Sequence, residues 1–427
     1  MTIRPRAAVR RAAAALTALG VLGALAACAP GAEPAASTQS QVEVFTWWAS
    51  GSEKLASDVL TSAFRRANPE IEFIHGGVAG GAGSAAKDVL ASRMANGDPP
   101  DSFQVHGGAE LAEQIAAGEV SDLTALYADL GLDRALPQVV LDLVSADGIP
   151  YAVPTNVHRA NLVWSNPSVL ADSGIDPLAT FATLDEWFVA LDRVRASGHT
   201  PLVLGAPWTQ VHLLEQVLLS RLGPAGYTAL WDGSGDSAEV TAAIEDYARL
   251  LGYANPDRDA LDWSDCADRL DSGEAAFLVM GDWAAQLLRD PIGWQPFPGT
   301  DGVDDIVVDG FAQAVGAPDP ENARLWLATV AAPDVQIAFA DAKGAAPARS
   351  DIPSVDLGTY PRRALESLRT DEIVLSLAHG GVTTPQALAE LTAVVGRLGR
   401  GQASTSEVQE SLTAAARAWQ PAGPSGS

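Results

Sequence analysis

The residues best suited to bind a ligand share one kind of position: each lies at the end of a predicted strand or at the start of a predicted helix. They combine indole rings with a carboxylate, an amide and imidazoles, and they are Trp47, Trp48, Gln104, His106, Trp283, Asp309 and His379. Indole faces can cover the C–H faces of a pyranose ring, and the polar groups can hydrogen-bond its hydroxyls. The set is poor in nucleophiles and metal ligands, so its chemistry suits a neutral polyol.

Each of these residues, taken alone, is more often structural than functional, and His158 and His212 could be satisfied polar residues of a core. Their recurrence matters because ligands of open α/β sheets bind outside the carboxyl ends of the strands. For Trp47 and Trp48, the alternative is that both rings are core. Neighbouring side chains of an extended chain point to opposite faces, so we expect one ring in the core and the other in a cleft.

Strands and helices alternate in the segment that must position the first of these residues. Strands are indicated by alternating apolar residues and helices by apolar residues at helical spacing. The expected elements are strands at 42–46, 71–75 and 101–106 and helices at 53–67 and 85–94. This order predicts an α/β fold with mainly parallel sheets and right-handed crossovers.

A second α/β unit is expected after a domain crossing at residues 151–161. Thr183 and Glu186 form a capping box that begins a helix. An amphipathic helix is expected at 208–222, and the last helix at 385–397.

Asp282, Asp309 and Lys343 are candidates in later parts of the chain. Asp282 suits the N-cap of a helix that begins with Trp283. A strand at 305–308 ends at Asp309, and Lys343 lies in a run of small residues that predicts a connection.

The charge of the chain excludes several classes of partner. The 427 residues include 53 acidic and 27 basic side chains, a formal net charge of −26. Nucleic acid and anionic lipid surfaces attract basic proteins, so we expect neither as a partner. The two cysteines, Cys28 and Cys266, show no spacing with histidines that would indicate a metal site. We expect no metal and no cofactor, and Cys266 is expected to be a small buried hydrophobe.

The N-terminus has the pattern of an export signal. Four arginines precede an apolar run at 12–24, and the sequence Leu25-Ala26-Ala27-Cys28 follows. This sequence resembles the lipobox of bacterial lipoproteins, which implies cleavage before Cys28 and diacylation of its sulfur. The alternatives are an ordinary secretory signal with an incidental cysteine, or a membrane helix, for which the run is short. The lipobox predicts a chain held at the outer face of the cell membrane.

Six segments together resemble the solute-binding proteins of bacterial ABC sugar importers. The resemblance is strongest to glucose/galactose-binding members of the family that includes maltose-binding protein. It covers nearly all of the chain after the leader and rests on residues 45–49, 97–106, 157–159, 208–210, 279–284 and 378–380.

The resemblance implies a two-lobed periplasmic-binding-protein fold of type II, with each lobe a sheet flanked by helices. The implied organisation is a signal peptide at 1–27, lipidated Cys28 and a linker at 28–40, an N-terminal lobe at 41–153 plus 309–345, a C-terminal lobe at 154–308 plus 346–420, and a disordered tail at 421–427.

The resemblance also implies a ligand site without catalytic residues. The candidate contacts are Trp47, Trp48, Glu53, Gln104, His106, His158, Trp263, Asp282, Trp283, Asp309, Lys343 and His379. The implied ligand is a neutral sugar, above all a monosaccharide, and the implied partner is the transmembrane part of an ABC permease. We expect a monomer that is not an enzyme.

Two rival functions remain open from the sequence. A secreted glycoside hydrolase would need two carboxyl groups at a set separation, for which Glu53 and Asp282 are the candidates. A sugar sensor or adhesive lipoprotein would bind sugar without importing it.

Overall fold

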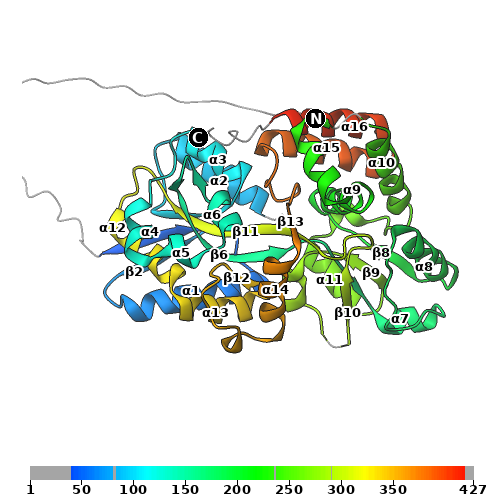
Figure 1. Ribbon diagram of the computed structural model, residues 1–427, viewed down its shortest axis with the longest axis horizontal. Helices are drawn as coiled ribbons and strands as arrows, with labels where there is room; N and C mark the ends of the chain where they lie inside the picture. The colour runs from blue at the N-terminus through cyan, green and yellow to red at the C-terminus, as the bar shows by residue number, and fades with distance from the viewer. Residues whose placement is uncertain (1–39, 80–82, 235–236, 290, 419–427) are drawn as a thin grey trace, which may run out of the picture. The chain divides into compact units, whose positions relative to one another are not determined.

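The computed structural model describes residues 40–418 apart from 80–82, 235–236 and 290. The described chain forms a larger and a smaller β-sheet, each covered by helices (Figure 1). We call the larger sheet with its helices the first lobe and the smaller sheet with its helices the second lobe. The predicted α/β class is confirmed. The predicted signal peptide, Cys28, most of the linker and the tail at 421–427 lie outside the described residues.

The first lobe is built on a seven-stranded sheet. The order on its main path is β12 (Ala346–Pro347), β6 (Ala152–Arg159), β11 (Val303–Gln313), β3 (Ser102–His106), β1 (Gln41–Phe45) and β2 (Glu72–Gly76), and β13 (Glu372–Leu375) also pairs with β11. A small hairpin joins β4 (Ser145–Ala146) to β5 (Ile149–Pro150).

The prediction of mainly parallel sheets is wrong. β1 pairs in parallel with β2 and β3, as the strand–helix alternation predicts. β11, however, runs antiparallel to both β3 and β6. β11 enters the first lobe from the second lobe. Its direction is therefore opposite to that of β1, β2 and β3, the N-terminal strands of the same sheet.

The second lobe has a four-stranded sheet in which only β8 and β9 are parallel. The order is β10 (Gly293–Pro296), β7 (Leu162–Ser165), β9 (Ala275–Val279) and β8 (Thr200–Val203).

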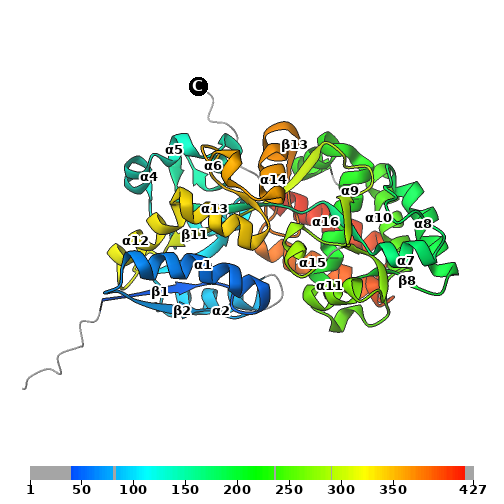
Figure 2. The same ribbon diagram turned by 90° about the horizontal axis from the view of Figure 1, so that it is seen from below.

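Helices cover both sheets, and Figure 2 shows α1 beside α13. Those of the first lobe are α1 (Gly51–Ala67), α2 (Ser84–Ala95), α3 (Ala109–Ala116), α4 (Thr124–Leu130), α5 (Leu132–Ala135), α6 (Gln138–Leu143), α12 (Pro320–Ala331), α13 (Pro333–Lys343) and α14 (Thr359–Thr370). Those of the second lobe are α7 (Pro167–Asp172), α8 (Leu184–Ala196), α9 (Pro207–Ala229), α10 (Ala238–Leu251), α11 (Trp263–Asp271), α15 (Pro385–Gly399) and α16 (Thr405–Ala418).

Three helical predictions need correction. α9 is buried on every side from Thr209 to Leu219 instead of amphipathic, because it packs against α10, α15 and β13. The chain after β9 forms only a short 3-10 segment, Asp282–Gln286, and the carboxyl of Asp282 does not cap it. Lys343 lies in the last turn of α13 rather than in a connection.

Three short segments connect the lobes: residues 160–161, 297–302 and 376–384. β6 and β11 remain paired on both sides of the predicted boundaries at 153/154 and 308/309, with Ile306 opposite Arg159 and Ala312 opposite Ala152. The boundaries themselves stay a prediction.

The buried guanidinium of Arg159 ties these connections together. It donates to the carbonyl of Val303 at 2.6 Å, to the carboxylate of Asp371 at 3.2 Å and to Oδ1 of Asn161 at 3.1 Å. It also faces the buried carboxyl of Asp304 at 3.9 Å. One cation therefore satisfies polar groups at the junction of both sheets.

No helix in the described part of the chain is long and apolar enough to cross a membrane.

We expect Arg159→Met to lower the free energy of unfolding by about 3 kcal/mol or more, because removing one partner of a buried ionic network leaves the others unpaired. Denaturant titration measures this loss. Arg221→Met is the matched control, since Arg221 is more exposed and pairs with Asp185 and Asp246 at the surface. Its loss should stay near 1 kcal/mol or below, and equal losses for the two variants would contradict the role of Arg159.

The pKa of Asp304 gives a pH prediction. Burial raises this pKa from 3.8 to about 7, although Arg159 opposes the rise. Between these values the folded chain binds more protons than the unfolded chain, so this carboxyl makes stability fall as pH rises, by at most about 1.4 kcal/mol per pH unit. Asp304→Asn should therefore gain melting temperature relative to the parent protein from pH 5 to pH 7.5. Parallel pH profiles of the two proteins would refute this assignment.

Candidate functional site

A cavity lies where the two lobes meet, with about 380 Å³ of empty space. Twelve of the described residues line it: Trp47, Trp48, Glu53, His106, His158, Trp208, Trp263, Trp283, Val307, Asp309, Lys343 and His379. Ten of them are among the twelve contacts predicted from the sequence. Gln104 and Asp282 do not border the cavity, and Trp208 and Val307 were absent from the prediction.

Trp47 and Trp48 both border the cavity, so the expectation of one core ring and one cleft ring is wrong. β1 ends at Phe45, and the alternation of a strand no longer governs the two residues that follow. Trp47 lies 4.8 Å from the ring of His106, and Trp48 packs on Phe339 at 5.2 Å, measured between ring centroids. Both rings therefore have one side in the core and another at the cavity.

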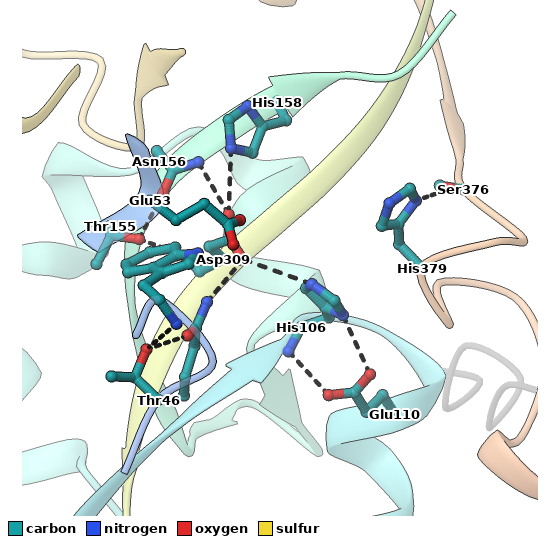
Figure 3. A network of polar contacts seen from close by, with 12 residues as sticks. Thr46, Glu53, His106, Glu110, Thr155, Asn156, His158, Asp309, Ser376 and His379 are labelled. Atoms are coloured by element: carbon teal, nitrogen blue, oxygen red, sulfur yellow. Dashed lines mark hydrogen bonds and ion pairs between the residues drawn. The ribbon is translucent and has the colours of Figure 1, made fainter. Parts of the chain in front are cut away.

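Asp309 is the carboxylate at the centre of the site (Figure 3). In β11 it lies opposite His106 of β3 and Asn156 of β6. Its Oδ1 accepts from Nε2 of Gln104 at 3.3 Å, and its Oδ2 accepts from Nδ2 of Asn156 at 3.1 Å. Nε2 of His106 lies 3.5 Å from Oδ1, and Nε2 of His158 lies 3.4 Å from Oδ2.

Gly310 allows this placement. The register of β11 against β6 shifts between Asp309 and Gly310. A Cβ at position 310 would lie 2.8 Å from the carbonyl oxygen of Val153, which is closer than atoms can approach without displacement. The glycine therefore lets β6 approach β11 at the bulge.

Gln104 and Asp282 act behind the cavity wall. The amide of Gln104 accepts from the hydroxyl of Thr46 and donates to Asp309. The carboxylate of Asp282 is fully buried and faces Nδ1 of His158, while its Oδ2 accepts from the backbone N–H of Arg159 at 3.0 Å and from the hydroxyl of Tyr360 at 3.0 Å. Both predicted contacts thus orient residues that reach the cavity.

His106 is held from behind by an ion pair. Its Nδ1 lies 3.1 Å from Oε2 of Glu110, and the ammonium of Lys87 lies 2.6 Å from the same oxygen. Burial raises the pKa of the Glu110 carboxyl. The charges of Lys87 and His106 have the opposite effect and outweigh it, so the pKa is lowered to about 2. Lys87 also lies 5.2 Å above the ring of Trp47, so one cation fixes two residues of the wall.

The second lobe contributes indole rings. The ring of Trp283 lies 5.2 Å from that of His158 and 5.1 Å from that of His379. A Cβ at position 281 would lie 2.1 Å from the indole of Trp283, so Gly281 gives this ring its place. Trp208 begins α9 after β8, a position of the type that marked the other candidates, and this signal could have identified it.

Lys343 and Glu53 form the remaining polar edge of the cavity. Nζ of Lys343 lies 3.4 Å from Oε1 of Glu53 and 4.9 Å above the ring of Trp48. The lysine comes from α13 and the glutamate from the first turn of α1. Within the described residues, no cluster of three or more histidine, cysteine, aspartate or glutamate side chains could hold a metal ion.

Known proteins share this architecture. The chain is 31% identical to an uncharacterized ABC transporter extracellular-binding protein of Pyrococcus horikoshii, over 90% of this chain and 88% of that protein. It is 28% identical to a xylose/arabinose-binding protein of Haloferax volcanii, over 90% of this chain and 86% of the relative. The solved structure of a chitin oligosaccharide binding protein superposes with a TM-score of 0.77 at 20% identity, covering 88% of this chain and 98% of that one.

The superposition confirms the two-lobed fold predicted from the sequence. The family described as bacterial extracellular solute-binding protein matches residues 50–337, about two thirds of the chain. Both findings agree with a cavity enclosed between two lobes, and the chain belongs to the bacterial extracellular solute-binding protein family.

Proposed function

We propose that the chain is the sugar-binding component of an ABC importer and that it holds one monosaccharide, of the glucose or galactose type, in the cavity between its lobes. The observation that carries this proposal is the convergence of five indole rings and a central carboxylate on one small cavity. The relative that is a xylose/arabinose-binding protein supports the sugar class.

The chemistry of the wall suits a polyol with apolar faces. Each carboxylate oxygen can accept two hydrogen bonds, and each oxygen of Asp309 already accepts one from an amide. The remaining lone pairs can accept from neighbouring hydroxyls of a sugar. The rings of Trp47, Trp48 and Trp283 offer faces for its C–H groups.

The size of the cavity favours one sugar ring. Its empty space, including the part open to solvent, is about 380 Å³, and side chains from both lobes surround it on several sides. The structural neighbour named for chitin oligosaccharides shares the fold, but a longer chain of rings would need more room than this cavity offers.

Binding requires the lobes to part. Trp48 is 1% exposed and His158 is 3% exposed, so a sugar cannot reach them in the closed form. A ligand that contacts both lobes stabilises the closed form, because only in that form can it contact the two lobes at once. The connections at 160–161, 297–302 and 376–384 are the places for such a hinge.

Import also needs a permease and a location near it. We propose that Cys28 carries the lipid anchor and that the chain works at the outer face of the cell membrane, where tethering raises its effective concentration near the permease. The relative that is an ABC transporter extracellular-binding protein supports the partner class.

The geometry favours binding over hydrolysis. A glycoside hydrolase needs two carboxyl groups that reach the scissile bond. Asp282 lies behind His158, and each of its oxygens already has a partner, so it cannot pair with Glu53 as acid or base. A sensor or adhesive lipoprotein would use the same cavity, and sugar uptake by a strain that lacks the gene distinguishes it from an importer.

A thermal-shift screen tests the function. We expect one hexose among glucose, galactose and other monosaccharides to raise the melting temperature most, because a ligand at 100 times its dissociation constant adds about 2.7 kcal/mol of stability. Disaccharides and chitin oligosaccharides should raise it less. A stronger effect of any longer sugar would refute the monosaccharide, and no effect of any sugar would refute the sugar class.

Trp283→Ala should weaken binding of the best sugar at least about ten-fold, since a buried aromatic at the centre of an interface contributes on this scale. Isothermal titration calorimetry measures the change. Trp294→Ala is the matched control, because Trp294 packs on Trp164 and Tyr360 away from the cavity. Equal affinities of the two variants would remove Trp283 from the site.

A further inference from the structure

A chain of buried polar groups lies behind His379, at the junction of the lobes. It runs from Asp305 of β11 through Glu215 of α9 and Ser376 to His379, all at most 7% exposed. Ser376 and His379 belong to the connection at 376–384. Figure 3 shows Ser376 on the side of the imidazole ring that faces away from Asp309.

The distances define the contacts of this chain. Oγ of Ser376 lies 3.0 and 3.1 Å from the two oxygens of Glu215 and 2.9 Å from Nδ1 of His379. The backbone N–H of Ala378 donates to Oε2 of Glu215. Nε2 of Gln216 donates to Glu215 at 3.0 Å and to Asp305 at 2.8 Å.

The carboxyl of Glu215 is the acceptor at the centre of this chain. Burial, together with the nearby charge of Asp305, raises the pKa of Glu215 well above its ordinary value. Whether protonated or ionised, a carboxyl group keeps oxygen lone pairs that accept hydrogen bonds. The lone pairs of Glu215 accept from Ser376 and from the N–H of Ala378.

The direction of the next hydrogen bond follows. A serine hydroxyl has one proton to donate, and Ser376 donates it to Glu215. Its oxygen must then accept from His379, which places the ring proton on Nδ1. Burial, with His212, His106 and Lys87 nearby, lowers the pKa of His379 well below its ordinary value, so the ring is neutral and Nε2 keeps its lone pair.

Among the described residues, no titratable group other than Glu215 and His379 hydrogen-bonds the hydroxyl of Ser376. Nδ1 of His212, on α9, lies 3.9 Å from Glu215, and burial lowers its pKa to about 4. The hydroxyl of Tyr227, also on α9, donates to the carbonyl of Leu375. Arg159, on β6, acts on Asp305 only by its charge.

We infer that Glu215 and Ser376 are positioning residues that hold His379 as a hydrogen-bond acceptor toward the cavity. A bound ligand must then present a hydroxyl proton to Nε2 of His379. An ether oxygen, a carboxylate or a phosphate at that point has no proton to donate and would face the lone pair of Nε2. This inference rests on the proposed function. It requires the sugar hydroxyl at His379 to be free, and a sugar that is extended through that oxygen is therefore excluded as a ligand.

Nitrogen NMR of the ligand-free protein tests the proton position directly. Long-range ¹H–¹⁵N correlation of the ¹⁵N-histidine-labelled protein distinguishes Nδ1–H from Nε2–H, and the chain has only six histidines. A spectrum of His379→Gln assigns the resonance. We expect Nδ1–H in the parent protein, and Nε2–H there would overturn the inference.

Variants test the positioning roles. Ser376→Ala removes the acceptor of Nδ1–H, so the ring should shift toward the Nε2–H form, whereas Ser376→Thr keeps the hydroxyl and should keep the parent tautomer. Glu215→Gln should also keep it, because the side-chain oxygen of glutamine can still accept from Ser376. An unchanged tautomer in Ser376→Ala would overturn the positioning role of Ser376.

Affinity gives a separate readout. With D-glucose and D-galactose as probes, Ser376→Ala should raise the dissociation constant about five- to ten-fold, the scale of one hydrogen bond. Ser376→Thr and the remote Ser173→Ala should stay within about two-fold of the parent. Unaltered affinity in Ser376→Ala would overturn the role of His379 as acceptor. Failure of both sugars to bind would contradict the proposed ligand instead, while the NMR result still decides the tautomer.

Discussion

The burial of one carboxylate between two lobes sets the terms for the rest of this structure. Asp309 is 3% exposed, and a buried charge is tolerated only where hydrogen bonds replace its hydration. The donors come from β3 and β6, the two strands that flank β11. The register of the sheet therefore supplies the hydrogen bonds that replace the hydration of the carboxylate. A slip of one residue in the strand pairing would remove these hydrogen bonds.

Much of the site was predictable because its residues mark the ends of elements. Trp47, His106, Trp283 and His379 all border the cavity, and each lies at or after the end of a strand or begins a helical turn. Asp282 shares that kind of position, and Gln104 lies inside β3 near its end, but the two lie behind His158 and Asp309. Sequence distinguishes the type of a position but not its depth, because depth depends on which strands become neighbours.

Long-range pairing limited the fold prediction in the same way. The order β1, α1, β2, α2, β3 follows from local patterns, but nothing local indicates that β11 lies antiparallel between β3 and β6. The burial of α9 had the same cause. Gln210, His212 and Glu215 are polar residues of the helix predicted as amphipathic, yet neighbours from distant parts of the chain cover them. The resemblance to a known family supplied the two-lobed arrangement that periodicity could not.

The burial of the residues that line the cavity has a kinetic consequence. A molecule held inside can return to solvent only when the lobes separate, so the frequency of that motion is an upper limit on the dissociation rate, whatever the equilibrium constant. Two ligands of very different affinity would then dissociate at rates that differ only in the fraction of lobe separations that release each ligand. The residence time of a ligand is in this way partly independent of its affinity. Substitutions at Arg159, remote from any contact with the ligand, would change the residence time.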